Sequence, residues 1–124
     1  MPILESSEMY VETIYTLSLE KEMVRGRDIC NYLGFSRPSV SRALNVLKEK
    51  GYIRKEKNGC VKLTEGGKIL AKHLSDRREL LTRHFTSLGV DEKTAGEDAG
   101  RIVRFLSDAT FEAIKRQMIK SGTV

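Results

Sequence analysis

A run of hydroxyl and guanidinium side chains near position 40 carries the clearest chemistry in this sequence of 124 residues. The segment Ser36-Arg37-Pro38-Ser39-Val40-Ser41-Arg42 sets small hydroxyl groups beside two arginines long enough to reach a guanine edge or a phosphate. A helix starting there would add its positive end to the attraction for phosphate. These residue types favour contact with nucleic acid. The candidate contact residues are Ser36, Arg37, Pro38, Ser39, Ser41, Arg42, Asn45, Arg54, Lys55 and Lys57.

The positive charge is concentrated around this run. Residues 25–63 hold ten Lys/Arg and three Asp/Glu, a local charge of +7, whereas the remaining residues carry −2. A basic block beside a near-neutral remainder is typical of a protein that meets a polyanion at one end. No stretch approaches the roughly 18 apolar residues of a membrane helix, and the first residues lack the pattern of a signal peptide. We therefore expect a cytoplasmic protein without membrane partners.

Apolar spacing and capping residues predict three helices and a hairpin that position these side chains. A first helix is expected after Ser6 or Ser7, and a second between Gly26 and Gly34. Ser36 should cap a third helix that runs to about Lys50. The pair Asn58-Gly59 between two short strand-like runs predicts a two-stranded hairpin. Together these elements form a winged helix-turn-helix, in which the third helix enters the major groove of double-stranded DNA.

The second half of the sequence predicts helices only. Thr64, Asp91 and Ser107 are each placed to cap a helix with an apolar stripe. The predicted fold class is therefore mainly α, with a winged helix-turn-helix (three helices plus a two-stranded wing) in residues 1–64 and a helical domain in residues 65–124.

The cysteines and histidines do not form a metal motif or a disulfide framework. Cys30 and Cys60 lack a CxxC partner; Cys30 is expected in the core, and Cys60, in the wing, at a more exposed place. His73 and His84 fall three turns apart on one helix and cannot share an ion. Surface or interface packing is the expected role of both histidines.

The sequence resembles the diphtheria toxin repressor and manganese transport regulator family over essentially its whole length. The likeness is carried by Glu8-Met9-Tyr10-Val11-Glu12-Thr13-Ile14-Tyr15, by Arg37–Arg42, and by Leu63-Thr64-Glu65-Gly66-Gly67-Lys68. The resemblance implies a homodimeric repressor that binds a palindromic operator, with residues 65–124 as a helical dimerisation domain. It also implies a cofactor, Mn2+ or Fe2+.

The metal ligands of that family are mostly missing from this chain. Met9 and Glu12 stand at the first-helix ligand positions, while Arg78 stands where the family has a histidine. An arginine is never a ligand, and these divalent ions need several oxygen or nitrogen donors. We therefore expect that the usual metal site is altered or lost and that no cofactor is bound. The degenerate family positions are Met9, Glu12, Arg78, Gly100, Val103 and Arg104, with Thr82 at an auxiliary one.

One hypothesis explains the two arginines at metal-ligand positions. Arg78 and Arg104 would take over the structural role of the ion by pairing with Glu12, and Glu79 is a further candidate partner. The opposing interpretation is that both arginines are ordinary surface residues.

Three other classes of function remain as alternatives. An enzyme is disfavoured because the sequence has no nucleophile–base set, P-loop or dinucleotide motif. A winged-helix module that binds proteins would lack salt-dependent DNA affinity. A regulator that answers a small anionic ligand would need Arg78, Arg101 and Arg104 to line a pocket.

Overall fold

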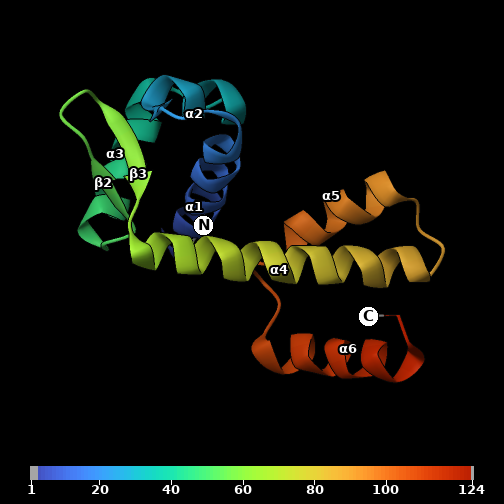
Figure 1. Ribbon diagram of the computed structural model, residues 1–124. Coiled ribbons are helices and arrows are strands. Elements are labelled where there is room, and N and C mark those ends of the chain that lie inside the picture. Colours follow the sequence, from blue (N-terminus) through green and yellow to red (C-terminus); the bar gives the residue numbers. More distant parts are fainter. Residues whose placement is uncertain (1–2, 124) are drawn as a thin grey trace. The chain divides into compact units, whose positions relative to one another are not determined.

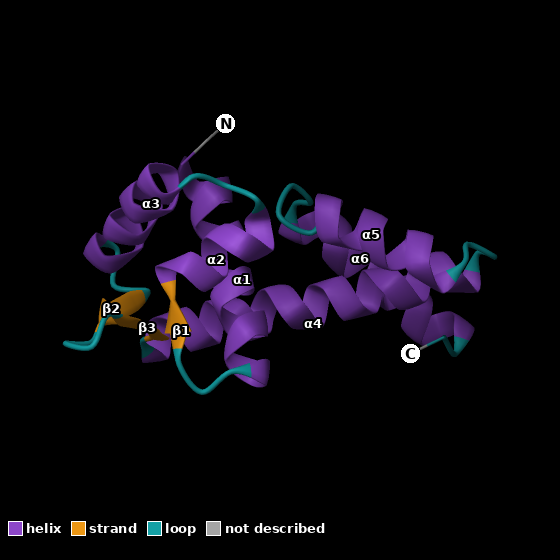
Figure 2. Cartoon of the chain, turned by 90° about the horizontal axis from the view of Figure 1, so that it is seen from above, coloured by secondary structure: helices purple, strands orange, loops and turns teal. Residues whose placement is uncertain are grey.

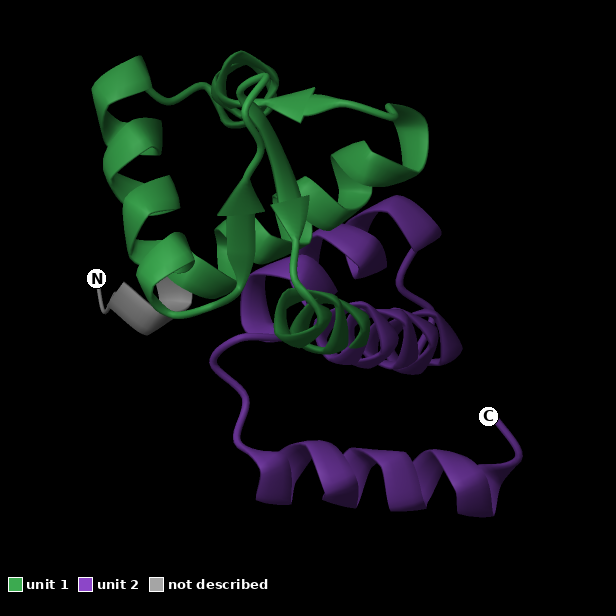
Figure 3. Ribbon diagram, turned by 60° about the vertical axis from the view of Figure 1, so that its left-hand side comes forward, with its two compact units in different colours: residues 1–72 green, residues 73–124 purple. Residues whose placement is uncertain are grey.

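The computed structural model describes residues 3–123, with side chains from Ser7 onward. The chain divides into two compact units, residues 1–72 and 73–124, and the division falls within a long helix (Figure 3). The elements follow one another as α1 (Ile3–Glu20), β1 (Val24–Arg25), α2 (Gly26–Leu33), α3 (Arg37–Glu49), β2 (Ile53–Lys55), β3 (Cys60–Leu63), α4 (Glu65–Ser87), α5 (Glu92–Ile102) and α6 (Asp108–Ser121).

The first unit packs three helices around one apolar core. Along α3, Val40, Leu44 and Leu47 are buried at helical spacing, as their sequence positions predicted. They meet a stripe of α1 and the inner side of the sheet. Gly34 ends α2 with φ of 74°, a backbone conformation that favours glycine. The helix-turn-helix of the prediction is confirmed.

The wing has one strand more than the sequence predicted. The hairpin of β2 and β3 turns at Asn58-Gly59, where Gly59 has φ of 85°. A third strand, β1, pairs with β3 on its other side, so the sheet order is β1-β3-β2 (Figure 2). The prediction missed β1 because two residues have no detectable alternation. Their strand geometry comes from the partner strand.

A close approach of two backbone segments joins the wing to α4. Thr64 Oγ1 donates to the Gly51 carbonyl at 2.5 Å and accepts from the Gly67 amide at 3.2 Å. At Gly67, a Cβ atom would lie 2.1 Å from the Tyr52 carbonyl oxygen. Only glycine fits this position of α4.

The second unit consists of helices with ordinary side-chain caps. Asp91 caps α5 by accepting from the Thr94 amide at 3.0 Å, and Ser107 caps α6 by accepting from the Thr110 amide at 3.2 Å. Both caps confirm the sequence prediction. Figure 1 labels α4, α5 and α6, whose apolar side chains form a separate core of Leu81, Ala99, Val103 and Phe111 with their neighbours.

Two local predictions were wrong. The first helix begins at Ile3, so neither Ser6 nor Ser7 is its cap. Cys60 is 1% exposed rather than accessible, because the added strand β1 covers β3 on one edge. Cys30 is half-buried and packs against the first core, as expected.

Candidate nucleic-acid interface and candidate metal region

The start of α3 is held by its own hydroxyl groups. Ser36 Oγ accepts from the Ser39 amide at 3.3 Å and donates to Ser39 Oγ at 2.9 Å. Arg42 Nη2 lies 3.4 Å from the same Ser39 oxygen. Pro38 sits in the first turn, where its missing amide hydrogen leaves no helical bond unmade. The predicted hydroxyl and guanidinium groups therefore lie together at the positive end of a helix dipole.

The polar stripe of α3 faces solvent over its whole length. Arg37, Ser41 and Arg42 are exposed, and so is Asn45 one turn further on. Opposite them, the apolar stripe is buried in the first core. This helix can be approached from outside without moving any side chain of the core.

A hollow of about 690 Å³ lies between α2, α3 and the wing, and we call it the α3 hollow. Four cationic side chains line it, and its lining residues include no carboxylate. Two of the four, Arg37 and Lys55, were predicted from the sequence. The other two, Arg25 and Arg27, were missed, although both lie inside the basic block of residues 25–63. The α3 hollow is a concave surface of one charge sign, which suits a polyanion.

Arg25 links the start of α2 to the tip of the wing. Its guanidinium donates to the Asn58 carbonyl at 2.5 Å, and its backbone amide donates to Asp28 Oδ2 at 2.8 Å. Asp28 also accepts from Lys21 Nζ at 2.7 Å. The hydrogen bond from Lys21, followed by the one from the Arg25 amide, lowers the pKa of Asp28 below its ordinary value. This network fixes the hairpin tip beside α2.

The three wing cations do not share one place. Lys55 Nζ donates to Asn45 Oδ1 at 3.2 Å and belongs to the α3 hollow. Arg54 points to the other face of the sheet, because neighbouring strand residues alternate, and its Nε lies 3.2 Å from Glu56. Lys57 is exposed in the turn.

At the candidate metal region of the second unit, an arginine fills the space of a side chain. A Cβ atom on Gly100 would lie 3.0 Å from both Cζ and Nη2 of Arg78. The same Nη2 makes a long hydrogen bond of 3.4 Å to the Gly96 carbonyl. The guanidinium of Arg78 therefore rests on the small-residue face of α5, where the family resemblance places a ligand.

The remaining positions also offer few donors. Val103 is buried, Arg104 is half-buried, and Thr82 Oγ1 donates to the Arg78 carbonyl at 2.8 Å. Glu79 pairs with Arg83 at 2.6 Å. Among the side chains that the structure describes, from Ser7 to Thr123, no group of three or more His, Cys, Asp and Glu is arranged to hold an ion. Glycine, valine and two arginines do not fit the coordination of Mn2+ or Fe2+.

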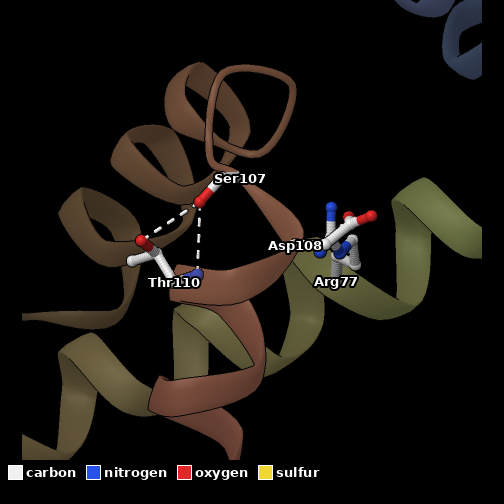
Figure 4. Close-up of polar contacts among 4 residues, drawn as sticks. All are labelled: Arg77, Ser107, Asp108 and Thr110. Carbon is white, nitrogen blue, oxygen red and sulfur yellow. Dashed lines mark hydrogen bonds and ion pairs between the residues drawn. The ribbon is translucent and has the colours of Figure 1, made fainter.

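A second arginine of α4 is buried against α6. Arg77 Nη2 lies 2.9 Å from Asp108 Oδ1, and its guanidinium stacks 4.2 Å from the centre of the Phe111 ring. The Arg77 side chain is 10% exposed and that of Asp108 is 89% exposed. Figure 4 shows this pair beside the Ser107 cap, at the first turn of α6. Arg77 thus fastens the start of α6 to α4.

Comparison with known proteins gives the family. The model of the iron dependent repressor N-terminal DNA binding domain matches residues 3–61. The HTH-type transcriptional regulator MntR of Lysinibacillus sphaericus is 35% identical over 102 residues, which cover 82% of this chain and 73% of that protein. The chain belongs to the iron-dependent repressor family. The predicted resemblance is thereby confirmed.

Solved structures show a similar fold. The crystal structure of T. acidophilum IdeR matches with a TM-score of 0.75 and 26% identity, covering 93% of this chain and 53% of that one. The hypothetical protein SSo2273 of Sulfolobus solfataricus matches in fold with a TM-score of 0.73 and 20% identity, covering 94% and 89%. The predicted fold class, mainly α with a winged helix-turn-helix, is confirmed. Among the described residues, no helix meets the length and apolarity of a membrane span.

Proposed function

We propose that this protein is a cytoplasmic transcriptional repressor without catalytic activity, which binds a palindromic DNA operator as a homodimer through the N-terminal half of α3. The observation that supports this most is the α3 hollow, with four cations and no carboxylate among its lining residues, beside the exposed hydroxyl-rich start of α3. Serine hydroxyls and Arg37 and Arg42 would contact bases and phosphates, while Arg25, Arg27 and Lys55 would hold the backbone.

The experiment is a binding titration on duplexes selected from a random-sequence pool, at several salt concentrations. Arg37→Glu is expected to lower affinity at least about 100-fold, because it removes a contact and adds a repulsion. Lys93→Glu, on the exposed first turn of α5, is the matched charge-reversal control and should change affinity little. Affinity that does not fall steeply with salt would favour a module that binds proteins instead.

Dimerisation is supported by apolar side chains that the second unit leaves exposed. Leu88, Phe105 and Ile119 are 68%, 61% and 58% exposed. A second copy of the chain would remove such surface from water. Sedimentation equilibrium should give a dimer, and Phe105→Glu should shift it toward monomer; a wild-type monomer at micromolar concentration would contradict the proposal.

We further propose that the guanidinium groups of Arg78 and Arg104 have replaced the metal of the family as permanent positive charges. Two observations support this proposal. The Arg78 guanidinium lies against Gly100, and few of the described side chains around it could be ligands of a metal ion. A guanidinium is a permanent cation, so DNA affinity should not depend on Mn2+ or on a chelator.

Calorimetric titration with Mn2+, Fe2+ and Zn2+ tests this directly. We expect no ion bound at one per chain in the micromolar range, and such binding would overturn the proposal. Arg104→Glu should weaken dimer formation or operator binding, because it puts a carboxylate where a cation is required. Normal operator affinity of this variant would refute a structural role of the Arg104 cation.

A further inference from the structure

Two candidate contact residues of the first unit are joined by a hydrogen bond, which fixes the groups that they can offer to a base. Lys55 Nζ, in β2, donates to Asn45 Oδ1, in α3, at 3.2 Å. A lysine ammonium has three hydrogens to donate and no lone pair with which to accept. The carboxamide of Asn45 must therefore turn its oxygen toward Lys55, which leaves its NH2 group on the other side.

The backbone between the two residues holds this pair in place. Where α3 ends, the Tyr52 amide donates to the Leu47 carbonyl at 3.0 Å, which ties the start of the wing to the helix. Lys55 stands opposite Val61 in the β2–β3 register, and its side chain lines the α3 hollow. The approach of Lys55 to Asn45 therefore follows from the turn after α3 and from the register of the strands.

Both side chains remain open to a partner. Asn45 and Lys55 are exposed, and Asn45 follows Ser41 and Arg42 by one turn on the polar stripe of α3. The residues that line the α3 hollow include no carboxylate, so none of them neutralises the charge of Lys55. A base edge that approaches this stripe would meet the NH2 group of Asn45 and the remaining hydrogens of the Lys55 ammonium. All of these groups are donors.

The four bases differ in how well they suit a group of donors. In the major groove, guanine presents two acceptors, N7 and O6. Adenine and cytosine present an amino group there, and thymine presents one acceptor beside its methyl group. An asparagine usually reads adenine by donating to N7 and accepting from the N6 amino group. Beside Asn45, the ammonium of Lys55 takes up the accepting side and would repel that amino group, so this pair of donors favours guanine.

We propose that Asn45 and Lys55 act together as a pair of donors that reads a guanine in the major groove. This inference rests on the proposed DNA-binding function and names the base that one part of the interface selects. Lys55 contributes to this selection in two ways, because it donates to the base and because it withholds the Asn45 oxygen from adenine. Removal of the ammonium, with Asn45 kept, should therefore change which base is preferred.

Selection of duplexes from a random-sequence pool, by the full chain and by its variants, tests the proposal. The wild type should select guanine at one position at which Asn45→Ala loses the preference. In Lys55→Met the Asn45 oxygen can accept from adenine, so the ratio of affinities for guanine over adenine at that position should fall at least about tenfold. Lys57→Met, in the exposed turn of the wing, is the matched control and should leave this ratio unchanged.

The outcomes separate this inference from the proposed function. If Lys55→Met weakens binding to all duplexes alike and keeps the ratio, Lys55 contacts only phosphate. That result overturns the inference and leaves the proposed function standing. A wild type that selects no guanine at a position sensitive to Asn45→Ala also overturns the inference alone, whereas a wild type that binds no duplex overturns both.

A measurement without DNA tests the hydrogen bond itself. In NMR spectra of the isotope-labelled full chain, Lys55→Met should shift the side-chain NH2 signals of Asn45, because the ammonium that polarises the carboxamide is gone. Lys57→Met should leave these signals in place. Asn45 signals that do not respond to Lys55→Met would overturn the inference, whatever the affinity of the protein for DNA.

Discussion

Arginines do opposite things in the two units of this protein. In residues 1–72, Arg37 and Arg42 extend from an exposed helix face into solvent, and Arg25 and Arg27 line an open hollow. In residues 73–124, Arg77 is buried against α6, and Arg78 rests on the backbone of α5. The first set is available to a partner, and the second set is used to hold helices together.

This difference between the units shows that the surroundings of a guanidinium decide whether it stays in solvent or packs between helices. The N-terminal unit has a continuous apolar core and can leave its cations outside. The C-terminal unit has a smaller core. Its helices are also joined by the ion pair and cation–π contact of Arg77 and by the packing of the Arg78 guanidinium on Gly100. Long arginine stems pack as well as pair, so they can replace other means of joining helices.

The largest effect is expected where the first unit depends on backbone fit. Gly67→Ala should lower the free energy of unfolding by about 3 kcal/mol or more, because its Cβ would collide with the rigid Tyr52 carbonyl. All four tyrosines lie in residues 1–72, so tyrosine fluorescence during urea unfolding reports on this unit alone. Gly66→Ala, whose Cβ would meet ordinary contacts at 3.8 Å, is the control. Equal stability of the two variants would contradict a clash between the Cβ atom at position 67 and the Tyr52 carbonyl.

The next largest effect concerns the buried Arg77 of the second unit, and removing its partner Asp108 should cost more stability than removing Arg77 itself. Asp108→Ala should cost about 2 kcal/mol, since it leaves the buried Arg77 guanidinium without its carboxylate. Arg77→Met should cost less, because it removes the buried charge and keeps a side chain on Phe111. Hydrogen exchange of the α6 amides is the measurement. Asp98→Ala breaks the exposed pair with Arg101 and should change stability by less than about 0.5 kcal/mol.

A smaller effect tests the packing of the Arg78 guanidinium on α5. Gly96→Ala should stabilise the helix by about 1 kcal/mol, because its Cβ would meet open space. Gly100→Ala should gain less, because the guanidinium must move away. In an Arg78→Ala background, the two glycine substitutions should raise the melting temperature by the same amount. An additive cycle would mean that Arg78 does not rest on Gly100.

The smallest effect is a difference in acid stability carried by one aspartate in each unit. Hydrogen bonds lower the pKa of Asp28 through Lys21 and that of Asp91 through Thr94. A carboxyl whose pKa is lowered on folding contributes stability above its unfolded pKa of about 3.9, and this contribution is lost as the pH falls through the folded pKa. Asp28→Asn should therefore flatten the acid limb seen by tyrosine fluorescence, and Asp91→Asn should leave it unchanged. The reverse result would contradict the assignment.

Much of the fold could be predicted because its signals are local. Ser36, Asp91 and Ser107 each cap the helix that their neighbours predicted, and Asn58-Gly59 makes the turn of the wing. The polar stripe of α3 followed from a period of 3.6 residues alone. Of the candidate interface, Arg37 was found from this helical period and Lys55 from the predicted wing, but Arg25 and Arg27 were not found. Their place in the α3 hollow depends on how α2 meets the wing.

The sequence by itself determined the helices, the caps of α3, α5 and α6, and the location of the positive charge, because each depends on residue type and near neighbours. Tertiary structure alone decided that β1 joins the sheet, that Cys60 is buried and that Gly67 admits no side chain. It also decided which arginines face solvent and which rest on protein. These outcomes depend on atoms supplied by distant parts of the chain, and no local pattern records where those atoms will lie.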